Sequence, residues 1–137
     1  MHISITRKDK SVQIPASLIK RICRVVSEGE NQSFDELNIH FVGKKTISDM
    51  HAEYFDDPTP TDCITFPLDG PEEEYRLLGD IFVCPTVAKE YATKNQEDPL
   101  EECVLYVVHG LLHLFGYDDI NEKDRKMMKK AEKRYME

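Results

Sequence analysis

Two histidines and an aspartate in the last third of the sequence are the side chains best suited to chemistry. His109 and His113 are four residues apart, and Asp119 follows Gly116 by three residues. On an α-helix, side chains four positions apart lie one turn apart and differ by roughly 40° around the axis, so both imidazoles can reach one ion. A helix that ends at the glycine lets the chain turn back and bring the carboxylate to the same ion. The pattern therefore predicts a metal site made by His109, His113 and Asp119.

The length of this pattern decides how it is interpreted. A pair of histidines at this spacing on an apolar helix is a weak signal alone, because two buried core histidines would give the same sequence. The whole pattern H-x-x-x-H-x-x-G-x-x-D adds a helix stop and an acid within reach, which favours a metal. Three protein ligands would leave one position of the ion open for water or substrate, as catalytic zinc sites do.

The residue after the first histidine argues against a peptidase. Metalloproteases with H-E-x-x-H carry a glutamate there, and its carboxylate is the general base. Here that position is Gly110, which offers no proton acceptor. A metallopeptidase is therefore a weak alternative, and the helical spacing does not support an iron oxygenase with two histidines and one carboxylate.

Apolar spacing along the chain predicts the elements that must position these residues. Strands are expected at 2–7, 37–43, 62–66 and 77–84, a hairpin connection at 69–76, a loop at 56–61, and helices beginning at Pro15, Thr46, Pro85, Pro99 and Asn121. The longest helix carries both histidines, and Gly116 can end it in the left-handed conformation. Four strands with about five helices indicate a single α+β domain over residues 1–137, with the metal site at the end of a central helix.

The composition is that of a globular chain without a membrane segment. Hydrophobic residues make up 40% and charged residues 32% of the chain, as in ordinary folded domains. No apolar run approaches the roughly 20 residues of a membrane span, and the first residues lack the apolar stretch of a signal peptide. We therefore expect a cytoplasmic protein with no membrane partner.

The four cysteines do not form a recognisable metal-binding or redox motif. Cys23, Cys63, Cys84 and Cys103 are scattered, with no C-x-x-C pair. Each lies among aliphatic or aromatic residues, and free cysteine is one of the most buried residue types. Reduced core thiols are therefore favoured over a thiolate metal site.

The charge is unevenly distributed along the chain. The net charge of −8 argues against a protein that coats nucleic acid indiscriminately, but residues 121–137 hold seven Lys and Arg against four Asp and Glu. This basic helix, together with Lys44 and Lys45, could contact phosphate groups, or it could be an ordinary solvated face. The residues in question on the helix are Lys126, Lys129, Lys130 and Lys133.

The other histidines give weaker signals. His2 and His40 lie in strand patterns and are interpreted as polar-face or hydrogen-bonded core residues rather than ligands. His51 lies on the predicted second helix and could approach a substrate, although nothing in its spacing indicates this.

Three segments resemble the YbeY family of bacterial endoribonucleases, which act in ribosomal-RNA maturation. HGLLHLFGYDD, at 109–119, agrees with the family's H-G-x-L-H-L-x-G-Y-D-H at ten of eleven positions. PTDCITF, at 60–66, is similar to the family's P-T-D-V-L-S-F, and LGDI, at 78–81, resembles its L-G-D-I strand. These segments lie in the order that the family has.

This resemblance implies a fold, a cofactor and a substrate. The expected fold is a mixed four-stranded sheet with surrounding helices, and the expected cofactor is one zinc ion per chain, with no organic cofactor. The expected activity is zinc-dependent cleavage of single-stranded RNA in maturation and quality control of small-subunit (16S) ribosomal RNA. Ribosomal RNA and the small ribosomal subunit are the implied partners.

The chain departs from the family pattern at two positions. Asp119 stands where the third ligand is usually histidine, and Phe55 stands where the family has an arginine implicated in cleavage. A carboxylate ligand lowers the net charge of the ion and its power to acidify bound water, and it admits Fe²⁺ or Mn²⁺ more readily. The alternative function is therefore a ribosome-associated maturation factor with a structural metal and little cleavage activity.

Overall fold

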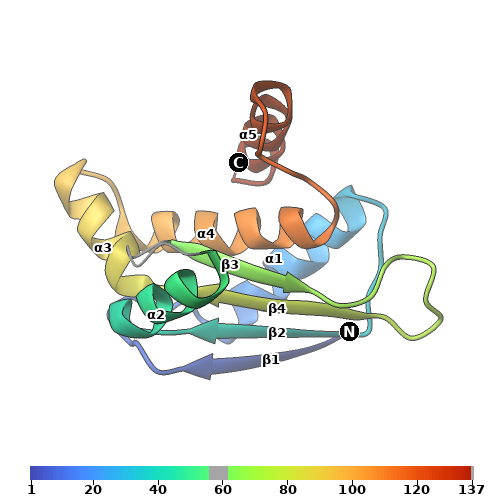
Figure 1. Cartoon of the computed structure of the whole chain (residues 1–137), viewed down its shortest axis with the longest axis horizontal. Helices are drawn as coiled ribbons and strands as arrows, with labels where there is room; N and C mark the ends of the chain where they lie inside the picture. Colours follow the sequence, from blue (N-terminus) through green and yellow to red (C-terminus); the bar gives the residue numbers. More distant parts are fainter. Residues whose placement is uncertain (56–61, 137) are drawn as a thin grey trace.

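A mixed four-stranded sheet is the base on which the helices of this chain pack (Figure 1). The computed structural model describes residues 1–55 and 62–136. Within these residues the strands are β1 (His2–Arg7), β2 (Glu36–Phe41), β3 (Cys63–Pro67) and β4 (Leu77–Val83), in the order β1-β2-β4-β3. The first two and β4 are parallel, whereas β3 runs antiparallel to β4. In this order β1 and β3 are the two edge strands of the sheet.

Five helices accompany the sheet in the described part of the chain. They are α1 (Ala16–Gly29), α2 (Lys44–Phe55), α3 (Pro85–Lys94), α4 (Pro99–Leu114) and α5 (Glu122–Met136). α4 packs on β3 and β4 with α1 beside it, and α5 packs on α4 away from the sheet (Figure 1). The buried Ile47 of α2 packs with Ile64 in a second, smaller cluster. The predicted α+β fold is confirmed.

The core lies between the sheet and α4. Alternate residues of β2, Leu37, Ile39 and Phe41, are buried, as the period of a strand requires. α4 buries Val107 and Leu111 in the same cluster. Each fully buried aliphatic side chain contributes about 1.5–3 kcal/mol of transfer free energy. This burial fixes the helix that carries His109 and His113.

α4 packs tightly on the sheet at Gly110. A Cβ atom at this position would lie 2.7 Å from Cγ2 of Ile81, 3.1 Å from Sγ of Cys63 and 3.3 Å from Cγ2 of Thr65. Since ordinary carbon contacts lie at about 3.5–4.0 Å, only glycine fits without movement of these side chains. The glycine after the first histidine therefore faces the sheet, where a glutamate could not act as a general base.

The predicted element boundaries hold to within two residues, with one loop untested. Pro15 caps α1 instead of opening it, α2 begins at Lys44 instead of Thr46, and the connection at 69–76 joins the antiparallel pair β3 and β4 as expected. Asn121 caps α5 as predicted, because its Oδ1 accepts a hydrogen bond from the amide of Asp124 at 2.8 Å. The predicted loop 56–61, with Pro60 and Thr61 of the family-like segment, lies outside the described residues.

The cysteines are core thiols, as predicted. Cys23, Cys84 and Cys103 are buried, Cys63 is partly buried, and all four are free. Burial raises the pKa of Cys23 and of Cys103 to about 12, so both thiols are protonated at neutral pH. In residues 1–55 and 62–136, no helix combines the length and the apolar character that crossing a bilayer requires.

The close approach at Gly110 predicts the sign of a stability change. Glycine-to-alanine substitution in an open helix position stabilises by about 1 kcal/mol. Overpacking a core costs about 1–3 kcal/mol. For Gly110→Ala we therefore expect a net loss of about 1 kcal/mol in the free energy of unfolding, measured by urea denaturation. In a double-mutant cycle, Ile81→Ala should reduce this loss, whereas a stabilising Gly110→Ala would contradict the packing.

Candidate metal centre

The beginning and end of α4 are both set by local sequence signals. Pro99 occupies the first helical position, and the Asp98 side chain accepts a hydrogen bond from the amide of Leu100 at 3.0 Å. At the other end Gly116 has φ +112°, as its predicted role as the helix stop requires. The chain then reverses through residues 115–119, which we call the ligand turn.

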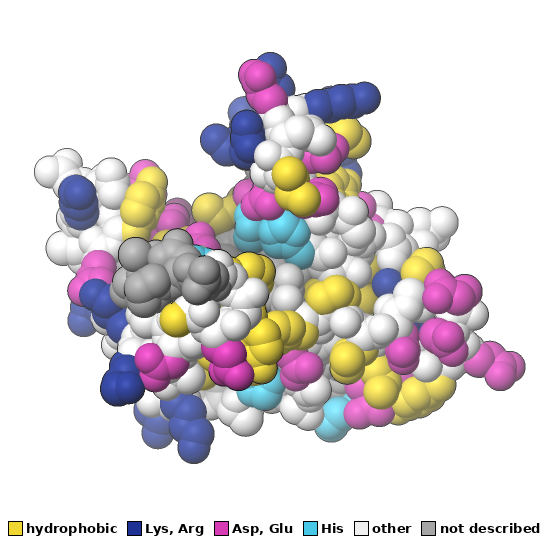
Figure 2. Space-filling view, in the orientation of Figure 1, with side chains coloured by type: hydrophobic (Ala, Val, Ile, Leu, Met, Phe, Trp, Pro, Cys, Tyr) yellow, Lys and Arg dark blue, Asp and Glu magenta, His cyan; other side chains and the backbone are white. Residues whose placement is uncertain are grey.

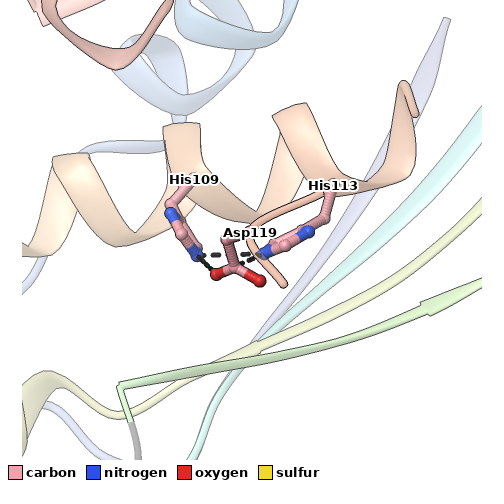
Figure 3. A group of neighbouring side chains, drawn as sticks. All are labelled: His109, His113 and Asp119. Atoms are coloured by element: carbon pink, nitrogen blue, oxygen red, sulfur yellow. Dashed lines mark hydrogen bonds and ion pairs between the residues drawn. The ribbon is translucent and has the colours of Figure 1, made fainter. Parts of the chain in front are cut away.

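Both histidines lie on the same flank of α4. At about 100° per residue, His109 and His113 are roughly 100° and 60° from the sheet-facing Gly110, in the same rotational direction. Their side chains are 25% and 24% exposed, so each imidazole is anchored in the protein yet open to solvent. Figure 3 shows the two rings and Asp119 converging beside α4.

The three side chains place one potential ligand atom each around a common point (Figure 3). Nε2 of His109 lies 3.1 Å from Nε2 of His113, and Oδ2 of Asp119 lies 3.8 Å and 3.5 Å from these two nitrogens. Tetrahedral ligands at 2.0–2.1 Å from zinc are separated by about 3.3 Å from one another. The spacing therefore suits one small divalent cation with a further position open.

The Nδ1 atom of each imidazole, on the side of the ring away from the proposed ion, has its own hydrogen-bond partner. Nδ1 of His113 donates a hydrogen bond to the backbone carbonyl of Tyr117 at 3.1 Å, since a carbonyl oxygen only accepts. Nδ1 of His109 lies 3.1 Å from Oε1 of Glu132 on α5. With the proton on Nδ1, each Nε2 keeps a lone pair that points toward the other ligands. A cation between the two Nε2 atoms would remove the electrostatic repulsion between their lone pairs.

Negative charge surrounds His109. Burial disfavours its protonated form, but the hydrogen bond to Glu132 and the charges of Glu132, Asp62 and Asp119 outweigh burial and raise the pKa of His109. The same negative charges would favour a divalent cation over a neutral ligand. A histidine pair on an apolar helix was also compatible with two core histidines, but the converging carboxylate and the partly exposed imidazoles fit that alternative poorly.

The remaining histidines do not join this group. His40 lies on β2, where Nε2 is 3.0 Å from Oδ1 of Asp80 and Nδ1 is 2.8 Å from Oγ1 of Thr6. His2 lies 3.4 Å from the hydroxyl of Ser4 on the same strand. His51 lies on α2, with its ring centroid 5.3 Å from that of Phe55. These contacts agree with the expectation that His2 and His40 are polar-face or hydrogen-bonded core residues.

The basic residues considered for RNA binding lie in different environments. Lys44 pairs with Glu90 at 2.9 Å, and Lys45 pairs with Asp49 at 3.0 Å, so both cations already have acidic neighbours. Lys126, Lys129, Lys130 and Lys133 are all exposed on α5. Figure 2 shows Lys and Arg side chains on the projecting helix above a patch of histidine.

Glu132 is a site residue that sequence reasoning missed. It lies 23 positions from His109, and no local spacing rule connects a residue of α5 with the outer nitrogen of a histidine on α4. The sequence held one signal, because Glu132 is an acid within the basic run KKAEKR. In the structure its side chain is only 16% exposed, which suits a partner for a metal-ligating histidine.

The contact between Glu132 and His109 predicts a specific loss of metal affinity. Removing an outer partner of a ligating histidine weakens metal binding by about 10–100-fold. We expect Glu132→Gln to lower zinc affinity by about tenfold, at the weak end of that range because the amide oxygen can still accept the hydrogen bond. The affinity is measured by competition with a chelator.

A second glutamate on α5 provides the control for that measurement. Glu122 is exposed and pairs only at the surface with Lys126, at 3.4 Å. Glu122→Gln removes the same charge from the same helix, so it should leave zinc affinity unchanged. Equal losses in both variants would mean that α5 acts through its total charge and that Glu132 does not orient His109.

The comparisons with known proteins identify the family of this chain. A family model described as "Endoribonuclease YbeY" matches residues 3–137. The chain is 47% identical over 135 residues to Endoribonuclease YbeY of Protochlamydia amoebophila, covering 98% of this chain and 90% of that protein. It is 35% identical over 133 residues to Endoribonuclease YbeY of Chlamydia trachomatis serovar D, covering 95% and 83%.

A solved structure gives the same result for the fold. The solution structure of TM1509 from Thermotoga maritima superimposes with a TM-score of 0.66 and 26% sequence identity, covering 98% of this chain and 85% of that one. These similarities cover 95–98% of this chain and 83–90% of the other proteins, so they include its sheet, α4 and the ligand turn. The resemblance drawn from three short segments is confirmed, and this chain belongs to the endoribonuclease YbeY family.

Proposed function

We propose that this protein is a zinc-dependent endoribonuclease that cleaves single-stranded RNA in the maturation and quality control of small-subunit (16S) ribosomal RNA. The observation that carries the proposal is the convergence of Nε2 of His109, Nε2 of His113 and Oδ2 of Asp119 in a member of an endoribonuclease family. In this proposal residues 1–137 form one catalytic domain. This domain acts in the cytoplasm on the small ribosomal subunit.

The proposed chemistry divides between the ion and the side chains of the chain. A bound divalent ion supplies a Lewis acid for a phosphoryl oxygen and lowers the pKa of a water molecule. His109 and His113 hold neutral nitrogen ligands toward it because their outer nitrogens are fixed by Glu132 and by the Tyr117 carbonyl. Asp119 adds a carboxylate whose side chain is 45% exposed, on the solvent side of the group.

Hydrolysis of a peptide is disfavoured by the packing of α4. The position that carries the general base in H-E-x-x-H proteases is Gly110, which faces Ile81 and Cys63 instead of the three converging ligand atoms. A phosphodiester is a more suitable substrate, because RNA carries an internal nucleophile in its 2′-hydroxyl group and does not depend on a water molecule alone. A divalent ion held by His109, His113 and Asp119 would supply a Lewis acid for this reaction. The 2′-hydroxyl or a water molecule would attack the phosphorus while the bond from phosphorus to the leaving ribose oxygen breaks and that oxygen takes up a proton.

The shape around the site favours a flexible single strand. The imidazoles lie beneath α5, and the histidine patch in Figure 2 opens on the same face as that projecting helix. A single RNA strand can bring one phosphate into such a recess, whereas a duplex holds its backbone in a fixed shape. In this proposal the neighbouring phosphates are bound by four lysines of α5, Lys126, Lys129, Lys130 and Lys133. These lysines provide a local positive surface for RNA on a chain whose net charge is −8.

A ribosome-associated maturation factor with a structural metal is the second candidate. The carboxylate of Asp119 lowers the charge of the ion, and Phe55, which is 56% exposed at the end of α2, stands where the family has an arginine. Both features weaken stabilisation of a negatively charged transition state. With both features we expect the chain to bind the metal and to cleave RNA slowly.

Metal-dependent RNA cleavage tests the leading proposal. We expect the purified chain loaded with zinc to cut single-stranded RNA containing 16S sequence, and we expect chelation to abolish this activity. His113→Ala should lose both metal and cleavage, because two ligands hold zinc poorly. A chain that binds zinc but cuts no RNA, alone or on small subunits, would support the structural-metal alternative.

The aspartate ligand provides a second variant in the same assay. Asp119→His replaces an anionic ligand by a neutral one, so the ion becomes more positive and holds hydroxide at lower pH. The pH–rate profile should therefore shift to lower pH with the fold unchanged. An identical profile would show that metal-bound water is not the titrating group.

A further inference from the structure

The first residue of the ligand turn is held by side chains from distant parts of the sequence. Nε2 of Gln32, in the loop after α1, donates a hydrogen bond to the backbone carbonyl of Phe115 at 2.9 Å. Nη1 of Arg76, at the end of the 69–76 connection, donates to Oε1 of Gln32 at 3.0 Å. The guanidinium carbon of Arg76 also lies 5.8 Å from the centroid of the Phe115 ring. Gln32 thus fixes the carbonyl group of Phe115, and Arg76 contacts its ring.

The burial of Arg76 is unusual for its residue type. Arginine is rarely buried unless a carboxylate pairs with it, yet Arg76 is only 4% exposed. Arg76 donates hydrogen bonds to the Gln32 side chain and to the backbone carbonyls of Asp69 and Ser33, at 3.2 and 3.3 Å for the two carbonyls. The negative charges of Glu72 and Asp69 also favour its charged form. A rigid, planar group with five donors suits the task of joining several loops to one point. Here that point is the end of α4.

The position of Phe115 sets the positions that follow it in the ligand turn. The Tyr117 amide donates to the Leu112 carbonyl at 2.9 Å, and the Tyr117 carbonyl accepts the hydrogen bond from Nδ1 of His113 at 3.1 Å. Asp119 follows two residues later. A shift of Phe115 would therefore turn the His113 ring and displace the third ligand together.

We propose that Gln32 and Arg76 are positioning residues of the metal site, which hold the ligand turn so that His113 and Asp119 meet His109 at one ion. This inference rests on the proposed function, because it assigns the two residues to the same metal site. Neither residue touches the ligand atoms, so their effect must pass through Phe115 and the backbone of the turn.

The substitution Gln32→Glu separates positioning from general stability. A carboxylate still accepts from Arg76, with which it forms a charge-assisted pair, but it cannot donate to the Phe115 carbonyl. We expect cobalt(II) affinity, measured by titration of the visible absorption bands, to fall about tenfold, as for other outer partners of a metal site. The band shape should move toward that of Asp119→Ala.

Asn95→Asp is the matched control. Nδ2 of Asn95 donates to the Tyr91 carbonyl at 2.8 Å at the end of α3, which carries none of the proposed ligands. The same change from amide to carboxylate removes the same kind of bond there. Thermal unfolding of the metal-free proteins should change by no more for Gln32→Glu than for Asn95→Asp, while only Gln32→Glu loses cobalt affinity.

The outcomes distinguish this inference from the proposed function. If the parent chain binds one equivalent of cobalt and Gln32→Glu binds it equally well, the positioning role is wrong and the proposed function stands. If the parent chain binds neither cobalt nor zinc, the metal site itself is wrong and the inference falls with it. Should Gln32→Glu fail to fold, Arg76→Lys decides, because lysine keeps the charge but loses the planar contact with Phe115. Parent-like affinity in that variant overturns the proposal.

Discussion

The close packing of α4 on the sheet at Gly110 determines where the chemistry of this protein can occur. A Cβ atom there would lie 2.7 Å from Cγ2 of Ile81, so a larger residue at this position would have to displace side chains of β3 and β4. Once this face of α4 is fixed, the helical period places His109 and His113 on one flank, where both reach solvent beneath α5. The same constraint removes the protease-type general base.

Each of the three proposed metal ligands is oriented by a different part of the fold. Glu132 on α5 fixes the outer nitrogen of His109, and the Tyr117 carbonyl fixes that of His113. Asp119 is delivered by a turn whose first residue is held by Gln32. Because the partners come from α5, from the turn and from the loop after α1, the site can form only when the whole sheet-and-helix assembly is in place. Metal affinity should therefore report on the fold as well as on the ligands.

The parts of the site that depend on local spacing could be predicted, and the parts that depend on tertiary packing could not. The four-residue interval between the histidines and the stop at Gly116 are properties of one helix. Glu132 and Gln32 reach the site from positions 23 and 83 residues away from their partners, and no period connects them. Lys44 was considered for RNA binding because sequence reasoning could not reveal its pairing with Glu90.

The central claim is that one ion is held by two imidazoles and one carboxylate, with a further position open. X-ray absorption spectroscopy of the zinc-loaded protein measures this directly, because it counts nitrogen, oxygen and sulfur neighbours of the metal. The account predicts two imidazole nitrogens at about 2.0–2.1 Å, with oxygen ligands from Asp119 and solvent and no sulfur. A sulfur neighbour at about 2.3 Å would contradict it, since that distance would assign the metal to a cysteine thiolate. A third imidazole in place of the carboxylate would contradict the role of Asp119.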